Sequence, residues 1–88
     1  MATHEEHCQE CLETLGEPFI HVHDWLDEFS YKMGPPHRFE RHHTEGVEEV
    51  RERWGDQAAE AAILHIKRDY YGQVPVKAQA DIWKILGF

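Results

Sequence analysis

The stretch DQAAEAAILHIKRDYYG, residues 56–72, decides the fold because it specifies one long amphipathic helix from beginning to end. Asp56 is a favourable capping residue, and Gly72 is the residue at which we expect the helix to stop. Between them, apolar side chains recur every three or four residues and so share one helix face: Ala59, Ala62, Ile63, Ile66 and Tyr70. Three alanines surround His65 and leave room for bulky side chains from a neighbouring helix: Ala58, Ala61 and Ala62.

The same helical spacing recurs in four other segments. A capping box, Thr3-x-x-Glu6, starts a helix that ends at Gly16, and Pro18 is well placed at the start of the next helix. Gly34-Pro35-Pro36 separates this second helix from a third that ends at Gly55, and Pro75 precedes a short last helix. Their apolar stripes are Cys8, Cys11, Leu12 and Leu15; Val22, Trp25, Leu26, Phe29 and Met33; Phe39, His43, Val47, Val50 and Trp54; and Ala80, Ile82, Trp83, Ile85 and Leu86.

These patterns predict an all-α fold. No alternation of apolar and polar residues lasts long enough to form a strand, and short loops favour antiparallel neighbouring helices. We therefore predict one domain over residues 1–88, a compact bundle of four main helices plus a short C-terminal helix. Trp25, Trp54 and Trp83 should be mostly buried because each lies on or beside a stripe. Gly46 interrupts the third helix, and it marks either a kink or a close helix crossing.

Size and charge restrict the partners. The chain has 88 residues, with 17 acidic, 9 basic and 8 histidine side chains, and its net charge of −8 argues against nucleic acid. No apolar run approaches the length of about 18 residues that a membrane span needs, and the first residues are acidic and polar, unlike a secretory signal. We expect a cytoplasmic protein of a bacterium or phage. A domain this small buries only about 60% of its unfolded surface, which favours a homodimer. An acidic surface also suits a basic protein partner.

Three segments carry histidine and aspartate at ligand spacing. His23-x3-Asp27 and His65-x3-Asp69 each place an imidazole and a carboxylate on one helix face. His37-Arg38-x3-His42 lies between them in the sequence. Nitrogen and oxygen donors of this kind suit Zn, Fe(II), Mn or Ni. The predicted metal ligands are His23, Asp27, His37, His42, His65 and Asp69.

Two other interpretations of these residues remain open. They can form a buried hydrogen-bond network without a metal, or they can be exposed residues that share the spacing by coincidence. The guanidinium of Arg38 suits an anionic ligand such as phosphate, although a salt bridge to one of the many carboxylates explains it equally well.

The first helix carries a second group of possible ligands, His4, His7, Cys8 and Cys11, on one face. A straight helix spreads these four side chains over about 10 Å, which is too far for one ion. We expect the cysteines to be small apolar core residues, and His7 alone to reach the central cluster. His21 and His43 are expected at the surface and at the edge of the core.

The ordered motifs resemble an uncharacterised family of small bacterial and phage-encoded helical proteins, with the likeness covering most of residues 7–83. The motifs in this chain are His23-x3-Asp27; His37-Arg38-x3-His42 with Gly46-Val47; and His65-Ile66-x2-Asp69 with Gly72-x-Val74-Pro75, before a short Trp-containing helix. The resemblance implies that these histidines, aspartates and Arg38 belong to one site, and it implies no reaction. His42 and His43 both fit the second histidine of the middle motif.

The histidine–aspartate content is also similar to that of metal-dependent HD phosphohydrolases. The chain departs from them because its adjacent pair, His23-Asp24, comes first in order, and because 88 residues is very short. Two functions follow from the sequence. One is a small metalloprotein that hydrolyses a phosphorylated substrate, with Arg38 binding the anion. The other is a non-enzymatic interaction or accessory protein whose cluster is structural.

Overall fold

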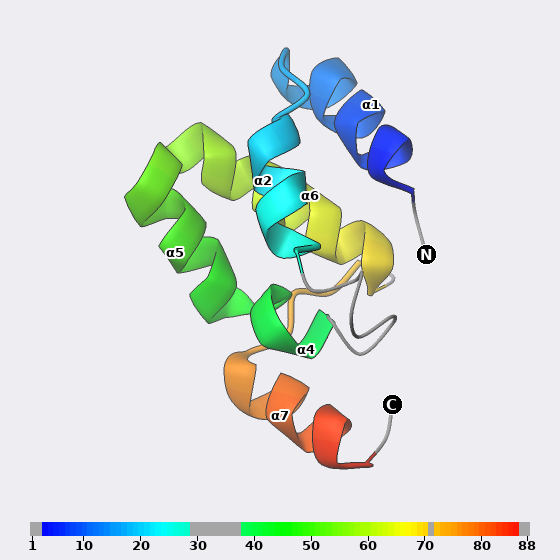
Figure 1. The fold of residues 1–88 in the computed structure, drawn as a ribbon, viewed down its shortest axis with the longest axis vertical. Helices are drawn as coiled ribbons and strands as arrows, with labels where there is room; N and C mark the ends of the chain where they lie inside the picture. Colours follow the sequence, from blue (N-terminus) through cyan, green and yellow to red (C-terminus); the bar gives the residue numbers. More distant parts are fainter. Residues whose placement is uncertain (1–2, 29–37, 71, 87–88) are drawn as a thin grey trace.

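The computed structural model describes residues 3–28, 38–70 and 72–86, and of Arg38 and Phe39 it describes the backbone alone. Every regular element in this part of the chain is a helix (Figure 1). The predicted all-α fold is therefore confirmed. The helices are α1 (His4–Leu15), α2 (Ile20–Leu26), α4 (Arg38–Arg41), α5 (Thr44–Trp54), α6 (Asp56–Asp69) and α7 (Lys77–Leu86).

Helix α6 is the centre of the fold and lies within the predicted residues 56–72. The predicted cap is wrong, because Asp56 is the first helical residue and the N-cap is Gly55, with no side-chain cap hydrogen bond. Helix α6 packs against α1, α2 and α5. In Figure 1, α6 passes behind α2, and α5 lies to the left of both helices. The alanines of α6 are almost fully buried, which lets the neighbouring helices approach closely. The apolar core consists of Cys11, Phe19, Val22, Trp25, Leu26, Val47, Val50, Ala58, Ala59, Ala61, Ala62 and Ile66.

The first two helices begin and end for local reasons. Thr3 and Glu6 form the predicted capping box of α1, and Gly16 ends the helix in the left-handed conformation with φ 86°. Helix α2 begins at Ile20, two residues after Pro18, because Phe19 takes a left-handed conformation with φ 52°. The predicted continuation of this helix through Asp27 toward Met33 is wrong, because α2 ends at Leu26, with Asp27 as its C-cap. Phe29, Met33 and the Gly34-Pro35-Pro36 break lie outside the described residues.

The predicted third helix is wrong as one element, because the chain leaves helical geometry at residues 42–43. His43 is extended there and acts as the N-cap of α5, with its Nδ1 accepting from the backbone N–H of Gly46 at 3.1 Å. The other ring nitrogen, Nε2, donates to the Glu40 carbonyl at 3.0 Å. A Cβ on Gly46 would lie 1.9 Å from the carbonyl oxygen of Arg41. Gly46 thus permits the close approach of two backbone segments.

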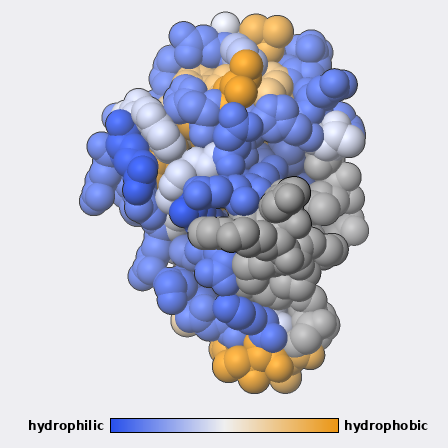
Figure 2. All heavy atoms as spheres, in the orientation of Figure 1, coloured by the Kyte–Doolittle hydropathy of each residue, from blue (hydrophilic) through white to orange (hydrophobic). Residues whose placement is uncertain are grey.

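Helix α7 lies at one end of the molecule and buries little of its apolar face. Ile85 and Leu86 are 84% and 66% exposed, and an apolar patch covers this end in Figure 2. Trp83 is half-buried against Tyr70, with ring centroids 5.5 Å apart. Among the described residues, no helix is both long and apolar enough to cross a membrane.

The prediction that all three tryptophans are buried holds only in part. Trp25 lies in the core, but Trp54 is 40% exposed. Trp54 is the last residue of α5 and packs with its ring edge toward Trp25, at a centroid distance of 6.3 Å. A stripe residue at the end of a helix has no neighbour beyond it, so one side of the Trp54 ring stays open to solvent.

Candidate metal centre

Three segments that are far apart in the sequence converge on one buried cluster. Asp27 closes the C-terminus of α2, His42 occupies the junction between α4 and α5, and His65 and Asp69 lie one turn apart on α6. Each of these residues offers one ligand atom, and the four atoms lie within 4.8 Å of one another. We call this set, Asp27, His42, His65 and Asp69, the central cluster.

Five of the six separations between its donor atoms lie between 3.0 and 3.4 Å, and all six lie within 4.8 Å. The Nε2 atoms of His42 and His65 are 3.0 Å apart. His42 Nε2 lies 3.3 Å from Asp27 Oδ1 and 3.3 Å from Asp69 Oδ2. His65 Nε2 lies 3.3 Å and 3.4 Å from the same two oxygens. A tetrahedral zinc site with nitrogen and oxygen ligands at about 2.0–2.1 Å has ligand–ligand separations of about 3.3–3.4 Å. The five separations that involve an imidazole are close to this value, and the two carboxylate oxygens lie within 4.8 Å of each other.

Hydrogen bonds among these four side chains cannot satisfy all the donor atoms well. A ring N–H points along one direction, so each imidazole can donate well to one of its three neighbours in the cluster. A cation at the centre interacts with all four donor atoms at once. The donor geometry therefore suits a small divalent ion better than it suits a set of pairwise hydrogen bonds.

The loop that carries His42 is held at both ends. Arg41 donates from Nη1 to the Trp25 carbonyl at 2.7 Å and to Glu28 Oε2 at 2.5 Å, and its guanidinium lies over the Trp25 ring at 4.3 Å. On the other side, the backbone N–H of Thr44 donates to the Pro75 carbonyl at 2.9 Å. These contacts fix the junction against α2 and against the segment before α7, which sets the position of His42.

Two further histidines surround the cluster without belonging to the four donors. His23 Nδ1 lies 2.8 Å from His65 Nδ1. The ring of His7 stacks on the ring of His65 with centroids 3.6 Å apart, and its Nε2 lies 3.4 Å from Asp69 Oδ1. Both side chains are buried. The predicted contact of His7 with the cluster is thus confirmed.

The pKa values of the cluster reflect opposing effects. Burial alone would raise the pKa of Asp69, but hydrogen bonds with His42, His65 and His7 outweigh it and hold this pKa well below its ordinary value. Burial likewise opposes a charge on His65, yet hydrogen bonds with Asp27 and Asp69 raise its pKa. Burial, followed by the charges of His65 and His7, lowers the pKa of His23 to about 3. A proton on His65 and a metal ion therefore compete for the same carboxylates.

The predicted ligands have different outcomes. Asp27, His42, His65 and Asp69 lie together, whereas His23 contacts the cluster from behind His65. His37 and the side chain of Arg38 lie outside the described residues. His43, which fitted the middle motif as well as His42 did, is occupied as the cap of α5. The sequence offers one signal for this difference, because Gly46 stands three residues after His43, where a cap receives its N–H.

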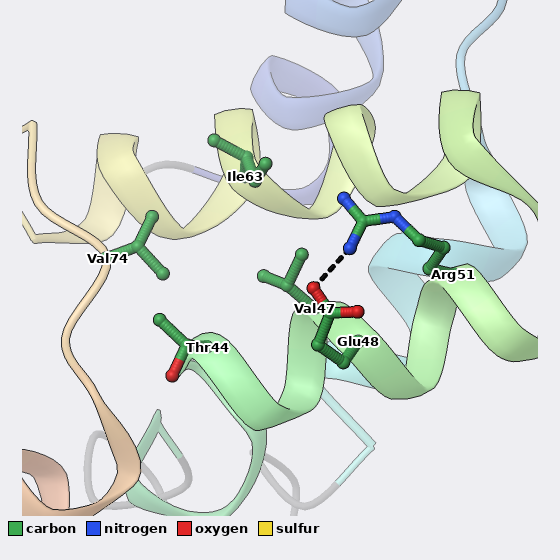
Figure 3. A pocket seen from close by; sticks show the side chains of 6 residues that line it. All are labelled: Thr44, Val47, Glu48, Arg51, Ile63 and Val74. Atoms are coloured by element: carbon green, nitrogen blue, oxygen red, sulfur yellow. Dashed lines mark hydrogen bonds and ion pairs between the residues drawn. The ribbon is translucent and has the colours of Figure 1, made fainter.

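A cleft lies elsewhere on the molecule, apart from the central cluster. Figure 3 shows a cleft between α5 and α6 in which Val47, Ile63 and Val74 face one another, with the ion pair of Arg51 and Glu48 at one end. Thr44 completes its lining, and no residue is shared with the central cluster. The cleft is mainly apolar and does not supply metal ligands.

Comparison of the chain with protein-family models, with curated proteins and with solved structures gives no match. The geometry of the central cluster is therefore the feature that bears on function.

Proposed function

We propose that the protein binds one divalent metal ion, Zn²⁺ in preference to Fe, Mn or Ni, through Asp27, His42, His65 and Asp69. The observation that supports this most directly is that five of the six donor separations are 3.0–3.4 Å and that all four donor atoms lie within 4.8 Å of one another. Zn²⁺ has no geometric preference from its d electrons and takes four nitrogen and oxygen ligands readily. The other three ions are found more often with additional ligands.

The ion would serve to hold the fold together. It joins α2, the α4–α5 junction and α6, and these segments belong to a domain with a small core. Binding to the folded state alone stabilises a protein by about 3–4 kcal/mol when the ion is present at 100–1,000 times its dissociation constant. That is a large part of the total stability of a small domain. A closed four-ligand site of this kind fits a non-enzymatic accessory or interaction protein.

The test uses the untagged full chain. We expect it to bind one equivalent of Zn²⁺, and to show the intense visible bands of four-coordinate Co²⁺ when cobalt replaces zinc. The variant His42→Ala should lose both properties. The matched control is His21→Ala, which removes an exposed histidine from α2 and should bind zinc like the wild type. A wild-type chain whose melting temperature is the same with zinc and with chelator would leave a metal-free hydrogen-bond network as the explanation.

A second candidate function, hydrolysis of a phosphorylated substrate, draws its support from Asp27. The side chain of Asp27 is 26% exposed, whereas those of His42, His65 and Asp69 are at most 1% exposed. If a water molecule took the place of Asp27, the ion would have the open position that catalytic zinc sites keep, and Asp27 would be a base beside it. Arg38 would then bind the anion.

The hydrolase proposal is tested with zinc- and manganese-loaded protein on a chromogenic phosphomonoester and phosphodiester. We expect turnover that Asp27→Asn reduces by a factor of about 100 or more, the effect of losing a general base. Asp24→Asn, the same change at an exposed aspartate of α2 whose side chain is 64% exposed, serves as the control. Turnover that is equal in wild type, Asp27→Asn and protein-free buffer would contradict this candidate and leave the structural role.

A further inference from the structure

The contact between His23 and His65 places one hydrogen between two ring nitrogens at the edge of the central cluster. Their Nδ1 atoms lie 2.8 Å apart, and both side chains are fully buried. At this distance one nitrogen donates its hydrogen and the other accepts with its lone pair. In a neutral ring, the direction of this bond also decides whether the other nitrogen carries a hydrogen or a lone pair.

Only one direction is compatible with a metal ion on His65. When His65 Nδ1 donates to His23, the Nε2 atom of neutral His65 keeps a lone pair that points to the centre of the cluster. When His23 donates instead, neutral His65 carries its hydrogen on Nε2 and directs it at Asp27 and Asp69. A metal-bound His65 therefore needs His23 as an acceptor.

Packing holds the ring of His65 in place. Packing does not decide which of its two ring nitrogens carries the hydrogen. The ring of His7 lies nearly parallel to it, with an interplanar angle of 13° and centroids 3.6 Å apart. The preceding turn of α6 carries buried Ala61 and Ala62. On the far edge, His23 is the residue that contacts Nδ1.

We infer that His23 is a positioning residue of the metal centre, whose Nδ1 accepts the Nδ1 hydrogen of His65 and so directs the Nε2 lone pair of His65 toward the ion. This inference rests on the proposed function, but the hydrogen bond that it invokes exists with or without an ion. His23 is not one of the four donors. Partners of this kind behind a ligating histidine typically change metal affinity by a factor of about 10–100.

The experiment compares His23→Asn with His23→Leu in the full chain. Asparagine carries a carbonyl oxygen close to where Nδ1 was, and can accept the hydrogen, whereas leucine fills the space without an acceptor. We expect His23→Asn to bind Zn²⁺ within a few-fold of wild type, and His23→Leu to lose affinity about 10–100-fold, in competition with a chromogenic chelator. Equal affinity of wild type and His23→Leu would overturn the inference, because a residue that only packs is replaced well by an apolar one.

A spectroscopic measurement separates this inference from the proposed function. In ¹⁵N spectra of wild-type protein loaded with zinc, His65 should carry its hydrogen on Nδ1, with a scalar coupling to His23 Nδ1 across the hydrogen bond. A hydrogen found on His23 Nδ1 in that sample would overturn the inference even if His23→Leu failed to fold. If wild type bound no zinc, the proposed function would fail by itself. The inference would then be decided by the direction of the hydrogen bond in the wild-type spectra: a hydrogen on His65 Nδ1 would support it, and a hydrogen on His23 Nδ1 would overturn it.

Discussion

Replacing Gly46 by alanine is expected to destabilise the protein, although alanine is the better helix former by about 1 kcal/mol. Gly46 lies in the first turn of α5, where the added Cβ would be 1.9 Å from the Arg41 carbonyl oxygen and 2.9 Å from its carbon. Ordinary contact begins at 3.4 Å, so the two backbone segments must separate by about 1.5 Å, the difference between 3.4 and 1.9 Å. No flexible side chain can move aside to relieve this contact.

The expected loss follows from two effects. Overpacking of a close contact costs about 1–3 kcal/mol. Moving Gly46 also weakens the bond from its N–H to His43 Nδ1, and loss of a helix N-cap costs about 1 kcal/mol. After the gain in helix propensity, the free energy of unfolding should fall by about 1–3 kcal/mol. Because His42 precedes the cap, zinc affinity should fall as well.

Urea unfolding followed by circular dichroism, in chelator and in zinc, measures both consequences. Glu52→Ala is the matched control, since Glu52 is an exposed residue of the same helix and its replacement should change stability by less than about 0.5 kcal/mol. A Gly46→Ala protein as stable as wild type, or more stable, would refute the close approach of Arg41 to Gly46.

Three other predictions concern the cap, the buried imidazoles and the exposed helix. His43→Ala should cost about 1 kcal/mol of stability through loss of the cap, yet lower zinc affinity less than His42→Ala does; the reverse order of affinities would contradict the assignment of the two residues. For metal-free protein, His23 has a pKa lowered to about 3, so the unfolded chain takes up a proton near pH 6.5 that the folded chain refuses. The contribution of His23 to the free energy of unfolding should therefore fall by about 1.4 kcal/mol per pH unit as the pH drops from about 6.5 toward 3. When the free energy of unfolding is measured with urea at each pH, it should change less steeply with pH in His23→Asn than in wild type. An equal change in both proteins would be evidence against a neutral, buried His23. Ile85→Lys should leave the melting temperature unchanged because Ile85 is 84% exposed. If α7 forms the interface of the predicted homodimer, the same variant should sediment as a monomer. A wild-type protein that is monomeric at high concentration would contradict the dimer.

The sequence predicts the helices well where one segment contains all the information. Residues 56–72 have an apolar face and a terminating glycine, and α6 occupies Asp56–Asp69 of this stretch, although its N-cap is Gly55 and not Asp56. The third predicted helix fails because a side chain competes with helical geometry. His43 has an apolar-stripe position, but its ring caps α5 and interrupts the helix. Gly46 indicated that the third predicted helix is irregular. Whether it marks a kink or a close approach could not be predicted, because that depends on the relative positions of two backbone segments.

The site was predictable in its components rather than in its assembly. Four-residue spacing places His65 and Asp69 together within one helix, and this pair is in the central cluster. The same spacing suggested that His23 and Asp27 act alike, but Asp27 faces the cluster while His23 reaches only the far nitrogen of His65. Helix α2 ends at Leu26, so Asp27 departs from the helical position that the spacing assumes. The sequence placed His7 near the cluster, but it did not identify Asp69, 62 positions away, as the residue that His7 contacts.

The most direct test of the metal centre is X-ray absorption at the zinc edge on the untagged, zinc-loaded chain. We expect four nitrogen or oxygen ligands at about 2.0–2.1 Å, with outer-shell scattering from two imidazole rings and one equivalent of zinc per chain. The His42→Ala variant should retain no zinc under the same conditions. Sulfur at about 2.3 Å would place the ion at Cys8 or Cys11 instead, and that result, or a chain that retains no zinc, would contradict the proposal.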